Sequence, residues 1–397
     1  MRLVRYLIVG VALIAGGTGW LWQRNRIDSS RNENDGPVVQ VRGFGELQDA
    51  LAIPSGLLVV EKQPGTAGVN AVAVAKDGSR SWRCDGAEAI LRPRAAGQPL
   101  LAVFRTGSQV TLRRLDADTG ASTDMLKFET ATSGAGLGRS WLSDGQSLFL
   151  IEVPQRAAGR LTRVDLATGA IRWQVTSSEY LDVDESSLIH RPALTLSDSL
   201  LVFCKEQWND FPTTLCRFAV AAGTLQNRIP EVIDVASEAT SEALFVLRKE
   251  TVQALRADGS PLWTRDLTGL QGRNVALAGS WVAVIARPDD HSSYLGAMDA
   301  HTGALLWERR TDGGVKTTSD FAARLGYLAI RYNANPAIRV YDQAGAETAG
   351  YALPTRLVIT TEFAGGFSEN LLGELVLAPP YLLYARAGRG LMIHKLP

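Results

Sequence analysis

The chain has 397 residues, of which 46% are hydrophobic and 21% are charged, and its 41 Lys and Arg balance its 41 Asp and Glu. The apolar fraction excludes an intrinsically disordered chain, and a net charge of zero argues against a nucleic-acid-binding protein, which needs a basic surface. Three cysteines are too few for a disulfide scaffold or a cysteine-rich metal fold, and the length alone is compatible with one large all-β domain or with two to three domains.

The N-terminal segment differs from the rest of the chain. Residues 6–22 are uncharged, follow Arg2 and Arg5, and would span about 25 Å as a helix, enough to cross a bilayer. The stretch ends in Trp20 and Trp22, which are typical of a membrane boundary and make a poor cleavage site. An uncleaved transmembrane anchor is therefore favoured, and a cleaved signal peptide is the alternative.

The organisation expected from this segment is an anchor or signal peptide over 1–25, a polar linker over 26–37, and one folded domain over 38–397. No cysteine precedes Cys84, so the segment is not a lipoprotein signal. A large domain after a single N-terminal anchor favours an orientation with the domain in the periplasm or otherwise outside the cytosol.

A short motif repeats along the remainder of the chain. The stretches 164–173 and 297–307 share Asp four residues before Gly, Thr one residue before it, and Trp four residues after it. Shorter copies occupy 73–82 and 254–263, and degenerate copies without the Trp end at Gly120, Gly223 and Gly345. The motif predicts a hairpin turn, because Asp bonds the backbone two residues on and Gly adopts a positive φ. The residues that define the motif are Asp165, Gly169, Trp173, Asp299, Thr302, Gly303, Trp307, Trp82 and Trp263.

The repeat length indicates the architecture. The seven motif glycines are 36 to 54 residues apart, and each repeat has room for four short strands, as in Asn274–Ala278, Trp281–Ala286, Tyr294–Met298 and Ala304–Arg309. Four strands per repeat of this length is typical of a β-propeller blade, and we expect each motif Trp to pack on the adjacent blade.

The chain ends determine the predicted number of blades. The last strand, Leu391–Lys395, has no partner after it, whereas Val38–Gly43 is a spare strand before the first repeat. Pairing these two strands closes an eight-bladed ring and protects both edges. The fold class predicted is thus an all-β, eight-bladed β-propeller with an N-terminal transmembrane helix, and a seven-bladed ring is the alternative.

The A-x-D-x-x-T-G-x-x-x-W string at 297–307 resembles the tryptophan-docking motif of the PQQ-like (quinoprotein alcohol dehydrogenase-like) propeller repeats. The resemblance covers the chain from about residue 38 onward. It implies the fold strongly and the function weakly, because the family includes quinone-dependent dehydrogenases as well as the non-enzymatic propeller of outer-membrane barrel assembly.

The sequence argues against a catalytic, metal-binding or cofactor-binding site. The cysteines Cys84, Cys204 and Cys216 include no adjacent pair of the kind the quinone enzymes often carry, and no calcium-loop spacing or phosphate-binding loop is present. The four histidines lie in different repeats without metal-ligand spacing. No catalytic, metal-binding or cofactor-binding residue is therefore predicted. Strand register predicts that Cys204 lies opposite Thr214 and that Cys216 lies opposite Val202. The two cysteines are then diagonal neighbours on adjacent strands, and the sequence leaves it undecided whether they form a disulfide.

The longer connections of the repeats fall mostly between the second and third strands, at Pro154–Arg160, Lys205–Thr213, Arg287–Ser293 and Asn333–Pro336. Variation concentrated on one face predicts the binding face of a repeat protein. Trp208 and Phe211 are candidate contacts for a protein partner, and packing against a neighbouring blade is the alternative. The irregular stretch Phe363–Glu374 is a second candidate contact.

The function predicted is a membrane-anchored, extracytoplasmic, non-catalytic scaffold that binds protein partners in a cell-envelope complex, with no nucleic acid and no cofactor. Because the chain lacks the lipid-bearing Cys of the barrel-assembly propeller that it resembles, the bacterial inner membrane is the expected location. The alternative is a quinone-dependent enzyme or a small-ligand sensor that uses the central channel.

Overall fold

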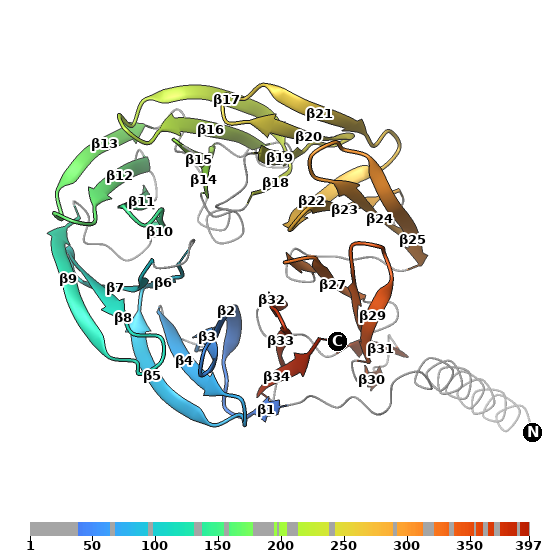
Figure 1. The fold of residues 1–397 in the computed structure, drawn as a ribbon, viewed down its shortest axis with the longest axis horizontal. Helices are drawn as coiled ribbons and strands as arrows, with labels where there is room; N and C mark the ends of the chain where they lie inside the picture. The colour runs from blue at the N-terminus through green and yellow to red at the C-terminus, as the bar shows by residue number, and fades with distance from the viewer. Residues whose placement is uncertain are drawn as a thin grey trace, which may run out of the picture.

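The computed structural model describes residues 39–63, 68–93, 98–130, 137–154, 159–177, 194–196, 198–204, 213–237, 243–288, 292–312, 321–332, 337–352, 355–359, 364–368, 374–386 and 390–396. The elements assigned within these ranges are all strands, and they lie around a ring (Figure 1). No helix in the described ranges is long and apolar enough to cross a membrane, and the predicted anchor at residues 6–22 lies outside them.

The strands form eight antiparallel four-stranded sheets, numbered here as blades 1 to 8 in chain order. The eight-bladed prediction is confirmed, and the seven-bladed alternative is wrong. Blades 1 and 2 contain β2 (Glu46–Ile53), β3 (Gly56–Lys62), β4 (Val69–Ala75), β5 (Arg80–Ala87), β6 (Ala89–Leu91), β7 (Leu100–Thr106), β8 (Gln109–Leu115) and β9 (Ser122–Glu129). Blades 3 and 4 contain β10 (Leu137–Ser143), β11 (Ser147–Pro154), β12 (Gly159–Asp165), β13 (Ile171–Ser177), β14 (Leu194–Leu196), β15 (Ser199–Cys204), β16 (Thr213–Ala219) and β17 (Leu225–Val232).

The second half of the ring follows the same order. Blades 5 and 6 contain β18 (Asp234–Ala236), β19 (Ala243–Leu247), β20 (Thr251–Arg256), β21 (Pro261–Asp266), β22 (Gln271–Ala278), β23 (Trp281–Arg287), β24 (Ser292–Asp299) and β25 (Leu305–Asp312). Blade 7 contains β26 (Phe321–Arg324), β27 (Tyr327–Tyr332), β28 (Ala337–Tyr341) and β29 (Glu347–Ala352). Blade 8 contains β32 (Val376–Ala378), β33 (Tyr381–Arg386), β34 (Gly390–Lys395) and β1 (Val39–Val41).

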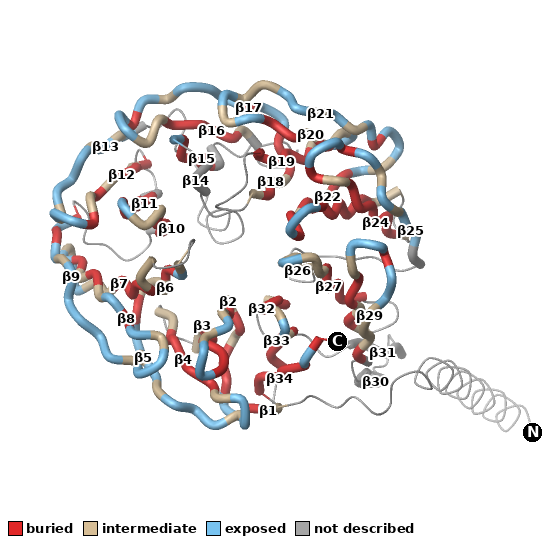
Figure 2. Tube along the Cα trace, in the orientation of Figure 1, coloured by how far each residue is buried: buried red, intermediate tan, exposed pale blue. Residues whose placement is uncertain are grey.

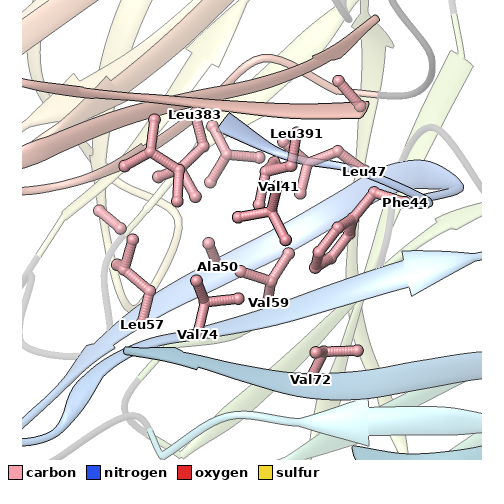
Figure 3. Close-up of a cluster of buried hydrophobic side chains, with 14 residues drawn as sticks. Val41, Phe44, Leu47, Ala50, Leu57, Val59, Val72, Val74, Leu383 and Leu391 are labelled. Atoms are coloured by element: carbon pink, nitrogen blue, oxygen red, sulfur yellow. The ribbon is translucent and has the colours of Figure 1, made fainter. Parts of the chain in front are cut away.

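Blade 8 joins the two ends of the folded domain. Its outer strand β1 pairs antiparallel with β34, with Val39 opposite Ile393 and Val41 opposite Leu391. The buried side chains of β1 and β34 pack with those of blade 1, including Leu47 and Val59 (Figure 3). The first and last segments of the domain therefore share one hydrophobic core.

The connection between blades 7 and 8 contains a separate hairpin. The strand β30 (Thr355–Ile359) pairs with β31 (Ala364–Ser368) in a two-stranded sheet that stands apart from blade 8. The innermost strand of blade 8 is β32. The stretch Phe363–Glu374, expected to be irregular, thus contains a strand.

Each pair of neighbouring blades encloses its own cluster of buried apolar side chains, so eight clusters seal the eight interfaces. The two middle strands of a blade face a neighbour on both sides, and this explains their continuous apolar runs. Exposure is concentrated on the outer strands along the perimeter (Figure 2).

Candidate functional site

The antiparallel order gives the ring two faces. The turns that join the first to the second strand and the third to the fourth strand lie on one face, called here the turn face. The connections between the second and third strands and between successive blades lie on the other, called the loop face.

The turn face is built from the repeated hairpin. In blade 3, Asp165 Oδ1 accepts hydrogen bonds from the backbone N–H of Ala167 at 3.1 Å and of Thr168 at 2.9 Å, and from the Thr168 hydroxyl at 2.9 Å. Asp299 in blade 6 makes the same three bonds with His301 and Thr302. Gly169 and Gly303 complete the turns with φ of 72° and 70°. These carboxylates hold the shape of the turns.

Electrostatics follow this bonding. The Arg172 guanidinium beside Asp165, together with the Thr168 hydroxyl and backbone N–H, lowers the pKa of the Asp165 carboxyl to about 2. The Thr302 hydroxyl and backbone N–H likewise lower the pKa of Asp299. Both carboxylates remain ionised at neutral pH.

Four tryptophans each link their own blade to the next blade in the ring. The indole Nε1 of each donates to a carbonyl oxygen in the following turn: Trp82 to Ala117 at 3.1 Å, Trp173 to Val220 at 2.8 Å, Trp263 to Ala300 at 3.0 Å, and Trp307 to Gln343 at 3.0 Å.

The glycines of those turns allow the close approach. A Cβ at Gly120, Gly223, Gly303 or Gly345 would lie only 2.5 to 2.7 Å from the indole of the preceding blade. At the interface of blades 2 and 3 the neighbour of Gly169 is Leu126, and at that of blades 4 and 5 the neighbour of Gly259 is Asn227. These tryptophans and glycines thus stabilise the ring.

The loop face buries charged groups where the second strands end. Glu61 is fully buried, and its carboxylate accepts from the Gly45 N–H at 2.8 Å and Gln63 Nε2 at 2.8 Å and pairs with Arg83 at 3.3 Å. The surrounding donors satisfy the carboxylate, so it holds the strand ends of blade 1 in place on the loop face.

A second group of charges lies between blades 2 and 3. Glu88 Oε2 accepts from Arg105 Nε at 2.8 Å, and Glu88 Oε1 accepts from Trp141 Nε1 at 3.3 Å. Glu152, 2% exposed, lies 3.8 Å from Arg160. The sequence reasoning missed these groups. One sequence pattern could have indicated them: a charged residue directly follows an apolar run at Glu61, Arg105, Glu152, Arg248 and Arg386.

Only some of the features predicted from the sequence lie among the described residues. The second and third strands that flank the four longer connections have their adjoining ends on the loop face, and most residues of these connections lie outside the described residues. Trp208 and Phe211 themselves lie outside the described residues. The predicted cysteine register is confirmed: Cys204 is opposite Thr214, and Cys216 is opposite Val202. Burial raises the pKa of the Cys84 thiol, which is free.

Among the residues that the structure describes, no three His, Cys, Asp or Glu side chains lie close enough together to hold a metal ion.

Comparison with known proteins supports the resemblance drawn from the motif. The model of the family described as Outer membrane protein assembly factor BamB matches residues 248–348, which include blade 6, the two outer strands of blade 5 and most of blade 7. Over these residues the chain is thus similar to the PQQ-like propeller repeats, as the motif predicted. No curated protein matches the sequence significantly.

Solved structures share the fold at low identity. A computationally designed protein, Ika8, is 11% identical with a TM-score of 0.57, covering 91% of this chain and 99% of its own. A europium-containing methanol dehydrogenase is 11% identical with a TM-score of 0.52, covering 87% and 83%. Apo AztD from Citrobacter koseri is 11% identical with a TM-score of 0.51, covering 79% and 87%. These likenesses concern the fold alone.

Proposed function

We propose that the chain is a non-catalytic scaffold that binds protein partners in a cell-envelope complex, with residues 6–22 as its membrane anchor and the propeller outside the cytosol. The observation that carries the proposal is the match of residues 248–348 to the BamB family model. The printed description of that family is an assembly factor, and assembly requires binding of other proteins.

The two faces of the ring support the same proposal. On the turn face, Asp carboxylates and motif glycines are used to shape turns, and indoles bond to turn carbonyls. On the loop face, Glu61 and Glu88 are satisfied by neighbouring donors and hold strand ends in place. A rigid rim that presents connections of unequal length is the arrangement by which repeat proteins bind partners.

The test is a crosslinking pull-down of the full chain from membranes, comparing the wild type with Trp208→Ala plus Phe211→Ala. The matched control is Ile171→Ala plus Leu262→Ala, which removes two exposed side chains from outer strands. We expect the first variant to lose a specific partner that the control retains. An unchanged partner list would reject the two aromatic residues as contacts.

Two further measurements test the remaining parts of the proposal. Extraction of the membranes at alkaline pH should leave the full chain in the pellet and release a variant that lacks residues 1–37. Pyrroloquinoline quinone with Ca²⁺ should leave the denaturation temperature unchanged, and a rise on their addition would contradict a non-catalytic role.

A further inference from the structure

The loop-face ends of the second strands change charge around the ring. In blades 1 and 3 this place holds the buried carboxylates of Glu61 and Glu152, and in blade 2 Arg105 pairs with Glu88 at 2.8 Å. In blades 5 to 8, an arginine stands within or directly after the last two positions of the second strand: Arg248, Arg287, Arg331 and Arg386. Blades 5 to 8 therefore carry guanidinium groups where blades 1 to 3 carry carboxylates or an ion pair.

A further arginine joins two of these positions between blades 5 and 6, which are neighbours in the ring (Figure 1). The pairing of β22 with β23 shifts register at Arg273, and Arg287 lies opposite Gln271, two residues before Arg273. A Cβ at Gly272 would lie 2.7 Å from the Arg248 carbonyl oxygen. These three arginines, called here the arginine cluster, thus occupy neighbouring backbone positions at the loop-face end of blades 5 and 6.

The guanidinium groups of the arginine cluster lack acceptors. All three residues are partly buried, and the Nε atom of each is shielded from solvent without a hydrogen-bond partner among the described residues. The ion pairs of the same ranges include none of the three, and the bond from Arg273 Nη2 to Gln271 Oε1 is long, at 3.4 Å. Buried donors are normally paired, and a charged donor left unpaired is costly. An anion that brings acceptor oxygens to these atoms removes that cost.

The carboxylate of Asp234, at the start of β18, is engaged by other donors. Its Oδ1 accepts from the Val235 N–H at 2.9 Å, and its Oδ2 accepts from the Val275 N–H of blade 6 at 3.0 Å. Both oxygens therefore serve the innermost strands of blades 5 and 6, and the charge of the arginine cluster is open to an anionic ligand.

We propose that the arginine cluster binds the carboxylates of an acidic segment of a protein partner. A guanidinium group presents its donors in a planar fork that matches a carboxylate, and partly buried pairs are screened less than exposed ones. Three cations at neighbouring positions fit a segment with several Asp or Glu side chains. The inference rests on the proposed scaffold function and specifies the chemistry of the partner on the loop face.

The first experiment measures binding of a defined anion to the purified full chain in detergent. In isothermal titration calorimetry, we expect a hexaglutamate peptide to bind, with an affinity that falls as NaCl rises, and a hexaserine peptide not to bind. Arg248→Gln plus Arg287→Gln should weaken hexaglutamate binding about tenfold or more, because hydrogen bonds to charged groups are lost. Arg273→Gln alone should weaken it as well, and it keeps the test available if the double variant loses the wild-type circular dichroism spectrum.

The matched control removes the same charge elsewhere. Arg113→Gln plus Arg339→Gln replaces two arginines that already pair with Asp124 at 2.9 Å and Glu347 at 3.2 Å, and it should leave hexaglutamate binding unchanged. No binding of hexaglutamate, or equal weakening by the two double variants, would overturn the proposal. Binding of inorganic phosphate without binding of hexaglutamate would also overturn it, because the cluster would then be a phosphate site.

The second experiment connects the arginine cluster to the partner. In the crosslinking pull-down from membranes, we expect Arg248→Gln plus Arg287→Gln to lose a specific partner that Arg113→Gln plus Arg339→Gln retains. Retention of every wild-type partner by the first variant rejects this surface while the scaffold stands. A wild-type chain without partners rejects both.

Discussion

The contact between Trp173 and Gly223 offers the sharpest test of how the blades are held together. A Cβ at Gly223 would lie 2.6 Å from the indole of Trp173, whose Nε1 donates to the Val220 carbonyl oxygen at 2.8 Å in the same turn. Gly223→Ala therefore forces the indole or the turn to move. Gly269 is the matched control, since its φ of 79° is also positive but a Cβ there would meet nothing within 4 Å.

The magnitudes follow from the two settings. Gly269→Ala carries only the left-handed backbone strain, about 1–2 kcal/mol. Gly223→Ala carries that strain and the overpacking against the indole, about 1–3 kcal/mol more, and weakens a hydrogen bond of about 1 kcal/mol. We expect Gly223→Ala to lower the free energy of unfolding by about 3–5 kcal/mol.

A double-mutant cycle isolates the contact. In a Trp173→Ala background the overpacking is gone, so Gly223→Ala should cost only the backbone strain, and the coupling free energy should be at least about 1 kcal/mol. Urea denaturation monitored by circular dichroism measures all four variants. Equal effects of Gly223→Ala and Gly269→Ala, or no coupling in the cycle, would refute the argument that indole docking stabilises the ring.

Three other predictions concern different parts of the ring. Glu61→Gln should destabilise the protein by about 1–3 kcal/mol, because the single NH2 group of the amide must face either the Gly45 N–H or Arg83 and there meets a donor, whereas the exposed Glu129→Gln should have little effect on the denaturation midpoint. Asp165 has a pKa of about 2 in the folded protein, below the value near 3.8 in the unfolded chain, so its stabilising contribution is fully present above pH 3.8 and is lost as pH falls towards 2. The difference in unfolding free energy between wild type and Asp165→Asn should therefore shrink from pH 5 to pH 2. A difference that grows over this range would contradict a lowered pKa. Val41→Asp should destabilise the protein by more than about 3 kcal/mol, because it buries an unpaired carboxylate in the core shared by blades 8 and 1, and a calorimetric transition at the wild-type temperature would show that β1 is dispensable.

The repeat predicted much of the fold because it records local chemistry. Asp and Thr at fixed distances from Gly predict a turn regardless of context, and a Trp four residues beyond Gly lies on the strand that follows. Strands of blade 6 were predicted to within a few residues, for instance Trp281–Ala286 against the observed β23. Copies without the Trp retained enough of the turn to mark seven blades, and the spare strand at Val38–Gly43 with the unpaired last strand supplied the eighth.

Other features depend on contacts that no local pattern encodes. The hairpin β30–β31 has strand-like residues, and only tertiary pairing shows that it stands apart from blade 8. The role of Glu61 depends on Gly45, which precedes β2, and on Arg83, which lies on β5. The turn with positive φ at Leu325 and Gly326 follows no local signal, because Leu-Gly is an unusual choice for that conformation.

The interfaces around the ring share an architecture but not a set of residues, and this difference bears on function. Tryptophan seals the turn-face side between blades 1 and 2, 3 and 4, 5 and 6, and 6 and 7, whereas Leu126 and Asn227 take the equivalent place at two others. A closed ring requires every interface between blades to be stable. Each interface needs to be fixed on only one face, and here the hairpin turns fix it on the turn face. Once the turn face supplies that fixed geometry, the loop face is free to vary in length without opening the ring.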